Sequence, residues 1–221
     1  HINRRMSMGG APVCFRKFDH CKKVARSKLF SDLSVGYSKG TGGNKVLAIP
    51  YYGDRQTTAN KALNKPDDMK GLKIRVPDAP LYTLFPRAVG ANPTPIAFAE
   101  VYLALQNKTV DAQENPLPTI DAKKFYEVQT HINLTAHITD ALLTIVGAPT
   151  WTKLSEADKK VFGDVFREAA VRATGEIVDS EKKLVGEVEK RGKTVVRVDR
   201  KPFIATVQKF SNEGKQPDGS A

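Results

Sequence analysis

The stretch GLKIRVP, residues 71–77, is a short apolar run bounded by a glycine and a proline. Its length and its flanking residues are typical of a buried β-strand. Alternation along such a strand predicts that Ile74 and Val76 face the core, so that Arg75 points to the other face or emerges at the strand's end. A guanidinium keeps its charge there and must be solvated or paired. Periodicity alone favours a structural salt bridge for Arg75 and leaves a binding role open.

Strands and helices are expected to alternate on both sides of this run. Strands are predicted at residues 46–52, 72–77, 109–116 and 194–199. Helical segments are predicted at residues 18–33, 64–71, 80–89, 98–105, 122–130, 155–191 and 202–210. The polar stretch GDRQTTANK, residues 53–61, is predicted to be a loop. This alternation is typical of an α/β fold with a mainly parallel sheet, whose ligands bind outside the carboxyl ends of the strands.

The composition excludes few classes of protein. The chain has 221 residues, of which 40% are hydrophobic, enough for one large or two small domains. A net charge of +11 favours an anionic partner, but the basic residues are spread along the chain without the aromatic neighbours that stack bases. Cys14 and Cys21 form a disulfide or remain two thiols. No run is long and apolar enough for a membrane span, and the chain begins at His1 without a signal-peptide core, which suggests a processed or truncated product.

Candidate binding residues stand out more clearly than catalytic ones. The four histidines lack metal-binding spacing, neither cysteine has a nucleophile signature, and no phosphate loop occurs, so we predict no enzyme, no metal and no cofactor. Arg55 follows strand 46–52 much as Arg75 closes its own strand. Two arginines at the carboxyl ends of two strands would converge on one crevice and grip a carboxylate. Asn115 closes the third run, either as a turn residue before Pro116 or as a ligand contact.

Residues 53–82 and 90–138 contain several unusual short motifs, among them RQTT, GLKIRVP, AFAEVYLALQ and ENP. Over about residues 12–210 the chain resembles the solute-binding proteins of tripartite ATP-independent periplasmic (TRAP) transporters, the DctP-type family. The resemblance implies a two-lobed α/β fold of the periplasmic-binding-protein type (type II, Venus flytrap) with a long helix in the C-terminal half. Residues 1–52 and 141–180 would be the remainder of lobe I, which is incomplete because the family's first third has no counterpart here. Residues 53–140 and 181–221 would form lobe II.

The resemblance also assigns roles to residues. It implies that Arg75 forms a bidentate salt bridge with the ligand carboxylate and that Arg55 supports it. Phe98, in IAFAE, would pack against the ligand, and Asn115, in QENP, would donate or accept a hydrogen bond.

The function implied is that of a periplasmic, monomeric receptor that captures a carboxylated solute and delivers it to the membrane subunits of a TRAP transporter, without catalysis. The sequences of residues 111–120 and 134–138 favour a uronate-type sugar acid as the ligand, followed by sialic acid and then a smaller mono- or dicarboxylate. A basic nucleic-acid-binding protein is the alternative from a different class.

Overall fold

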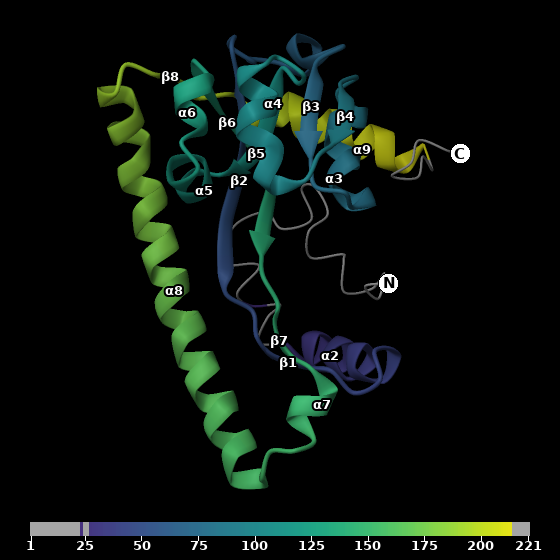
Figure 1. Ribbon diagram of the computed structural model, residues 1–221. Coiled ribbons are helices and arrows are strands. Elements are labelled where there is room, and N and C mark those ends of the chain that lie inside the picture. The colour runs from purple at the N-terminus through teal and green to yellow at the C-terminus, as the bar shows by residue number, and fades with distance from the viewer. Residues whose placement is uncertain (1–22, 24–26, 214–221) are drawn as a thin grey trace.

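The computed structural model describes residues 23 and 27–213 (Figure 1). The expectations for Cys14 and Cys21 lie outside the described residues. In Figure 1 a sheet with its helices forms the upper part of the molecule, and a smaller group of elements forms the lower part. The long helix α8, Glu156–Lys190, runs along both parts.

The main sheet has six strands in the order β4-β3-β5-β2-β6-β8. Their bounds are β2 Tyr51–Ala59, β3 Lys73–Val76, β4 Asn92–Pro95, β5 Ala112–Pro116, β6 His131–Ala141 and β8 Thr194–Val196. β3 lies parallel to β4 and β5, and β8 lies parallel to β6, but β2 is antiparallel to both β5 and β6. The prediction of a mainly parallel sheet is therefore wrong at the centre. Helix–strand alternation describes strands joined by helical crossovers, and β2 enters the sheet from the opposite end.

Residues 53–59, most of β2, are the clearest error of the sequence-based prediction, which expects a loop at residues 53–61. They include the end of the central strand, in which Thr57 and Thr58 are fully buried. Their hydroxyls are satisfied by side chains of neighbouring strands: Thr57 Oγ1 lies 3.2 Å from Thr135 Oγ1, and Gln113 Nε2 donates to Thr58 Oγ1 at 3.0 Å. A buried polar strand escapes a rule that recognises buried strands by apolar residues.

The observed helices lie closer to their predicted positions than the strands do. The helices of the described residues are α2 Lys28–Gly40, α3 Pro80–Ala88, α4 Val101–Gln106, α5 Leu117–Ala122, α6 Phe125–Val128, α7 Ala148–Trp151, α8 and α9 Arg200–Asn212, with short 3₁₀ segments η2 Pro66–Met69 and η3 Phe98–Glu100. The Ser155 hydroxyl accepts a hydrogen bond from Asp158 N at 3.1 Å and caps α8. Gly192 follows the end of α8 with a φ of 78°, a conformation that favours glycine.

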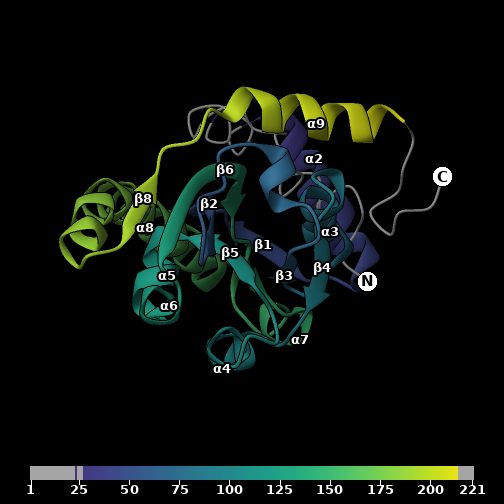
Figure 2. The same ribbon diagram turned by 90° about the horizontal axis from the view of Figure 1, so that it is seen from above.

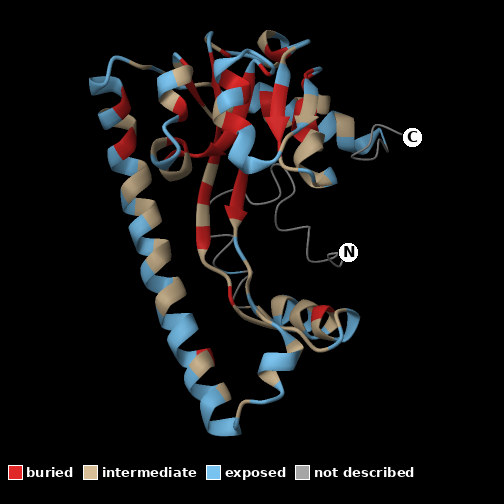
Figure 3. Cartoon of the chain, in the orientation of Figure 1, coloured by how far each residue is buried: buried red, intermediate tan, exposed pale blue. Residues whose placement is uncertain are grey.

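Two apolar clusters sandwich the sheet, and both lie in the upper part, where Figure 3 shows most of the buried residues. One joins Ile74 of β3 to Phe85 of α3 and Phe203 of α9. The other joins α4, α5 and α6 to Leu184 and Val188 of α8. Figure 2, the view from above, shows α9 and α4 on opposite sides of the strands. These clusters fix the strands that carry the candidate site.

The lower part is built around a two-stranded antiparallel sheet of β1, Lys45–Ala48, and β7, Thr144–Val146. β2 and β6 continue from this small sheet into the main one (Figure 1). The apolar side chains of α8 are only partly covered in this part, since Val165 is 55% exposed and Phe166 37%.

Gly53 lies where β2, Pro116 and α8 approach closely. Its φ is 130°, and a Cβ added to it would lie 2.6 Å from Pro116 Cβ and 2.9 Å from Glu181 Oε1. We expect Gly53→Ala to lower the free energy of unfolding by about 2–3 kcal/mol in urea titrations, through overpacking and backbone strain. Gly186→Ala is the matched control, since nothing lies within 4 Å of its added Cβ and alanine stabilises a helix by about 0.5–1 kcal/mol. Equal effects of the two variants would contradict the close approach.

Candidate functional site

Arg75 lies on the face of β3 opposite to Ile74 and is only 3% exposed. Its Nε and Nη2 donate to the carbonyl oxygen of Ile96 at 2.9 and 2.7 Å, which fixes the plane of the guanidinium. Among the described residues, no carboxylate lies within 4.0 Å of it, so the salt bridge that periodicity favoured is not formed there. Burial lowers the pKa of Arg75, an effect that Glu114 opposes and Arg55 increases. Arg75 nevertheless remains a cation at neutral pH.

Phe98, in η3, lies beside this cation. The Arg75 Cζ is 5.6 Å from the centroid of the Phe98 ring, within the range of a cation–π contact. Phe98 also packs edge-on against the buried Phe125, with centroids 6.2 Å apart and an interplanar angle of 84°. Because the ring is anchored on one side and 41% exposed, it can offer an apolar surface to a ligand.

Asn115 shares a face of the sheet with Arg75. The parallel register of β3 and β5 places Arg75 opposite Gln113, and Asn115 is two residues further along β5. Asn115 Nδ2 donates to Gln113 Oε1 at 2.6 Å. Asn115 is therefore a strand residue held by its neighbours, and the chain enters α5 directly after Pro116 without the turn that was predicted.

Arg55 occupies the middle of β2 rather than the carboxyl end of a strand, so the predicted convergence of two strand ends is wrong. Its Nε and Nη2 donate to both carboxylate oxygens of Glu114, and Nη1 donates to Asp140 Oδ2 at 2.9 Å. Nη2 also donates to Asn115 Oδ1 at 3.2 Å. The Tyr82 ring covers the guanidinium at 4.8 Å. The charge of Arg55 is thus compensated inside the protein, whereas that of Arg75 has no ion-pair partner in the described part of the chain.

The ionisation of this buried network follows from its contacts. Burial alone would raise the pKa of Glu114, but Arg55 and a hydrogen bond from His137 outweigh burial and lower it. Burial lowers the pKa of His137, so the imidazole is neutral at pH 7 although Glu114 opposes the shift. With Nε2 protonated toward Glu114, at 3.3 Å, Nδ1 accepts from the Thr135 hydroxyl at 2.8 Å. Burial raises the pKa of Asp140, with Arg55 acting in the opposite direction.

The four residues proposed from the sequence therefore form two contacting pairs, Arg75 with Phe98 and Arg55 with Asn115. Gln113 joins the pairs through the strand register and its bond to Asn115. Sequence reasoning missed Glu114, Asp140 and His137, which hold Arg55 in place. Glu114 precedes Asn115 in the motif QENP. A carboxylate next to a predicted site residue is a sequence signal from which Glu114 could have been found.

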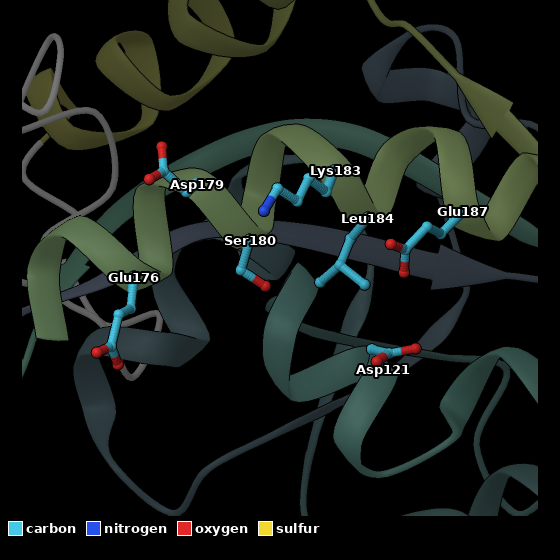
Figure 4. A pocket seen from close by; sticks show the side chains of 7 residues that line it. All are labelled: Asp121, Glu176, Asp179, Ser180, Lys183, Leu184 and Glu187. Atoms are coloured by element: carbon cyan, nitrogen blue, oxygen red, sulfur yellow. The ribbon is translucent and has the colours of Figure 1, made fainter.

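A hollow lies between α5 and α8 and is lined mainly by carboxylates (Figure 4). Its lining residues are Asp121, Glu176, Asp179, Ser180, Lys183, Leu184 and Glu187. Four acids and one lysine repel an organic anion, so this hollow does not suit a carboxylated ligand. None of the four residues proposed from the sequence lines it.

Glu181 connects α8 to the beginning of β2. Its Oε2 accepts from the Tyr51 hydroxyl and its Oε1 from Asp54 N, both at 2.8 Å. Burial raises the pKa of Glu181 to about 7, although both hydrogen bonds act to lower it. The carboxyl group is therefore partly protonated at neutral pH.

The substitution Glu181→Gln should change how the free energy of unfolding depends on pH. Because the folded pKa lies above that of the unfolded chain, the native state binds the extra proton, and stability is lost as pH rises from about 4.5 through about 7. The amide replaces the protonated acid, so we expect the variant to match the parent at pH 4.5 and to exceed it by about 1–2 kcal/mol at pH 8, after allowance for partial exposure. Unfolding free energies measured at both pH values test this. A difference that does not change with pH would contradict the raised pKa.

Two further classes of feature are absent from the described residues. No group of three or more histidine, cysteine, aspartate or glutamate side chains there is placed to hold a metal ion. None of the described helices combines the length and apolarity needed to cross a bilayer.

The site thus places a fixed arginine and an amide of the sheet near the aromatic ring of Phe98 in η3, and comparison with known proteins identifies the family of the chain. Residues 3–216 match the family described as bacterial extracellular solute-binding protein, family 7, DctP. The chain belongs to this family, whose members are solute-binding receptors. The family prediction made from the sequence is confirmed.

Individual relatives support the same assignment. The sialic acid-binding periplasmic protein of Vibrio cholerae is 42% identical over 202 residues, which cover 91% of this chain and 63% of the relative. The 2,3-diketo-L-gulonate-binding periplasmic protein of Escherichia coli is 33% identical over 200 residues, covering 90% and 60% of the two chains. The chain thus spans less than two thirds of the length of these curated relatives.

The fold is shared with solved structures. A TRAP periplasmic solute-binding protein of Roseobacter denitrificans with bound L-galactonate superimposes with a TM-score of 0.87 at 30% identity, covering 94% of this chain and 69% of that one. The predicted fold class, α/β of the periplasmic-binding-protein type with a long helix in the C-terminal half, is confirmed.

Proposed function

We propose that this protein is the receptor of a TRAP transport system and binds the carboxylate of an organic acid at Arg75, Phe98 and Asn115. The observation that carries the proposal is the buried guanidinium of Arg75, which is 3% exposed and lacks a carboxylate within 4.0 Å in the described part of the chain. A buried charge is costly unless an opposite charge compensates it. An incoming carboxylate supplies that charge, and Arg75 still has Nη1 available after its two bonds to Ile96.

Arg55 acts indirectly in this proposal. Its donors are engaged by Glu114, Asp140 and Asn115, so it positions Asn115 rather than forming the primary bond to the ligand. This agrees with the supporting role that the resemblance implied. Phe98 supplies the apolar wall for the carbon skeleton of the ligand.

The ligand class is argued from the relatives. One is named for sialic acid, one for 2,3-diketo-L-gulonate, and the Roseobacter structure contains L-galactonate. All three ligands are carboxylic acids with several hydroxyl groups. These ligands support the class of hydroxylated organic acids, within which we keep the order given by the sequence: a uronate-type sugar acid first, sialic acid second and a smaller mono- or dicarboxylate third.

The remaining parts of the proposal concern the whole receptor. We place residues 53–140 and 181–221 in lobe II, because both apolar clusters lie within these ranges, and residues 1–52 and 141–180 in lobe I. Binding would draw the lobes together, since contacts from both sides of a ligand exist only in the closed state. The receptor would act in the periplasm as a monomer and without catalysis, and its closed form would dock on the TRAP membrane subunits.

A thermal-shift screen followed by calorimetric titration tests the proposed function. The panel comprises D-galacturonate, D-glucuronate, D-galactonate, sialic acid and succinate, with D-galactose as the uncharged control. We expect a saturable shift with at least one acid and none with galactose. Absence of a shift with every acid would contradict the proposal, and binding of any duplex DNA with steep salt dependence would favour the nucleic-acid alternative instead. Recovery of the ligand unchanged after long incubation tests the absence of catalysis.

A further inference from the structure

A second cation lies over Phe98 in addition to Arg75. The ammonium nitrogen of Lys123 is 5.5 Å from the centroid of the ring, close to the 5.6 Å of the Arg75 Cζ. Lys123 is the C-cap residue of α5, so it reaches the ring from a different element than the arginine on β3. Phe98 therefore lies within cation–π distance of two positively charged groups, one on a strand and the other at the end of a helix.

Neither of these cations has an acidic partner within the described residues. The neighbouring Lys124 lies 3.7 Å from Glu127, and Asp121, two residues before Lys123, is ion-paired with Arg191. No carboxylate of the described residues lies within 4.0 Å of the Lys123 ammonium. The acids nearest to it along the chain are thus committed elsewhere, and the surface around Phe98 keeps two uncompensated positive charges.

We propose that Lys123 binds a second anionic group of the ligand, so that the site prefers a diacid over the corresponding monoacid. The inference rests on the proposed function, because it takes Arg75 as the contact of the first carboxylate. A sugar acid lying on the Phe98 ring places one end at Arg75 and directs the other toward Lys123. An ammonium is a compact point charge on a flexible stem, so it accepts a carboxylate or a phosphate at a range of distances, whereas the fixed fork of Arg75 selects a planar carboxylate.

The proposal identifies the aldarates, in which both ends of the sugar chain are carboxylates, as favoured ligands. Galactarate and D-galactonate form a matched pair, since they share the open carbon chain and differ in whether the last carbon is a carboxylate or a hydroxymethyl group. 6-Phosphogluconate and gluconate form the corresponding pair for a phosphate. These pairs isolate the second charge from the hydroxyl pattern.

Calorimetric titration of the 221-residue chain, of Lys123→Gln and of the matched control Lys124→Gln with these four acids tests the inference. Both substitutions remove one exposed charge, so they change the general field equally. We expect the parent to bind the diacid about tenfold tighter than the monoacid, Lys123→Gln to lose most of this preference with less than a twofold change for the monoacid, and Lys124→Gln to keep it. Preference for galactarate alone identifies the second group as a carboxylate, and preference for 6-phosphogluconate alone identifies it as a phosphate.

The possible failures are distinguishable. If the parent binds a monoacid but no diacid more tightly, or if Lys123→Gln and Lys124→Gln reduce the preference equally, the role of Lys123 is wrong and the proposed function stands. If the parent binds none of the acids in either panel, the proposed function and this inference are both wrong.

Discussion

Arg75→Ala is expected to weaken binding of the cognate sugar acid by about 30-fold to several-thousand-fold. Removal of one partner from a buried, hydrogen-bonded charge pair costs about 2–5 kcal/mol. The effect should be near the upper end, since Arg75 is the buried cation that lacks an ion-pair partner among the described residues. Arg75→Lys should also weaken binding, because an ammonium cannot reproduce a bidentate contact.

Stability provides an independent readout for Arg75. Its loss removes two hydrogen bonds to Ile96 but also removes an uncompensated buried charge, and these effects oppose one another. We therefore expect the unfolding free energy of Arg75→Ala to change by less than about 1 kcal/mol. Arg197→Ala is the control for affinity, since Arg197 is 61% exposed and pairs with Glu189. Affinity within threefold of the parent for Arg75→Ala would show that the carboxylate binds elsewhere.

In contrast to Arg75→Ala, which should mainly weaken ligand binding, Glu114→Gln should mainly lower the free energy of unfolding. Glu114 is 1% exposed, accepts from Arg55 Nε and Nη2, and lies 3.3 Å from His137 Nε2. Breaking a buried ion pair costs about 3–5 kcal/mol when the other charge is left uncompensated, and because Asp140 still pairs with Arg55 we expect a loss near the lower end of this range. Urea unfolding at pH 7 measures this loss. Glu189→Gln, which breaks an exposed pair with Arg197, should cost less than about 1 kcal/mol.

The pH dependence gives the sign of the Glu114 contribution. Its pKa is lowered in the folded state, so the ion pair stabilises the protein at neutral pH and this stabilisation is lost as pH falls through the folded pKa. The difference between parent and Glu114→Gln should therefore shrink toward acid. A difference that grows toward acid would contradict a carboxylate kept ionised by Arg55.

The parts of the fold that could be predicted are those with local signals. β3, α3, α8 and α9 carry their own caps, apolar stripes or bounding glycines, and each was expected close to where it lies. The sequence does not predict β6, and it predicts a loop for most of β2, because many of the buried polar residues of these strands are satisfied by residues far away in the sequence. The Thr57–Thr135 contact joins residues 78 positions apart. No window of sequence contains both partners.

The candidate site divides in the same way. Arg75, Phe98 and Asn115 lie in distinctive sequence motifs, so they could be proposed as binding residues from the sequence. The residues that hold them in place could not be predicted from the sequence. Asp140, for example, lies 85 positions from Arg55 and approaches it only through the pairing of β2 with β6. The consequence was that Arg55 was placed at a strand end, whereas the network shows it enclosed within the sheet.

The length of α8 gives the molecule a mechanical property. Its 35 residues make a rod of about 52 Å, which contacts β1 toward one end and β8 at the other (Figure 1). A rod of this length amplifies rotation: a tilt of about 5° at one end displaces the other by about 5 Å. Glu181, bonded to β2 between these contacts, lies where such a lever would have its fulcrum. A tilt of about 5° about Glu181 would displace the start of α8, 25 residues away, by about 3 Å.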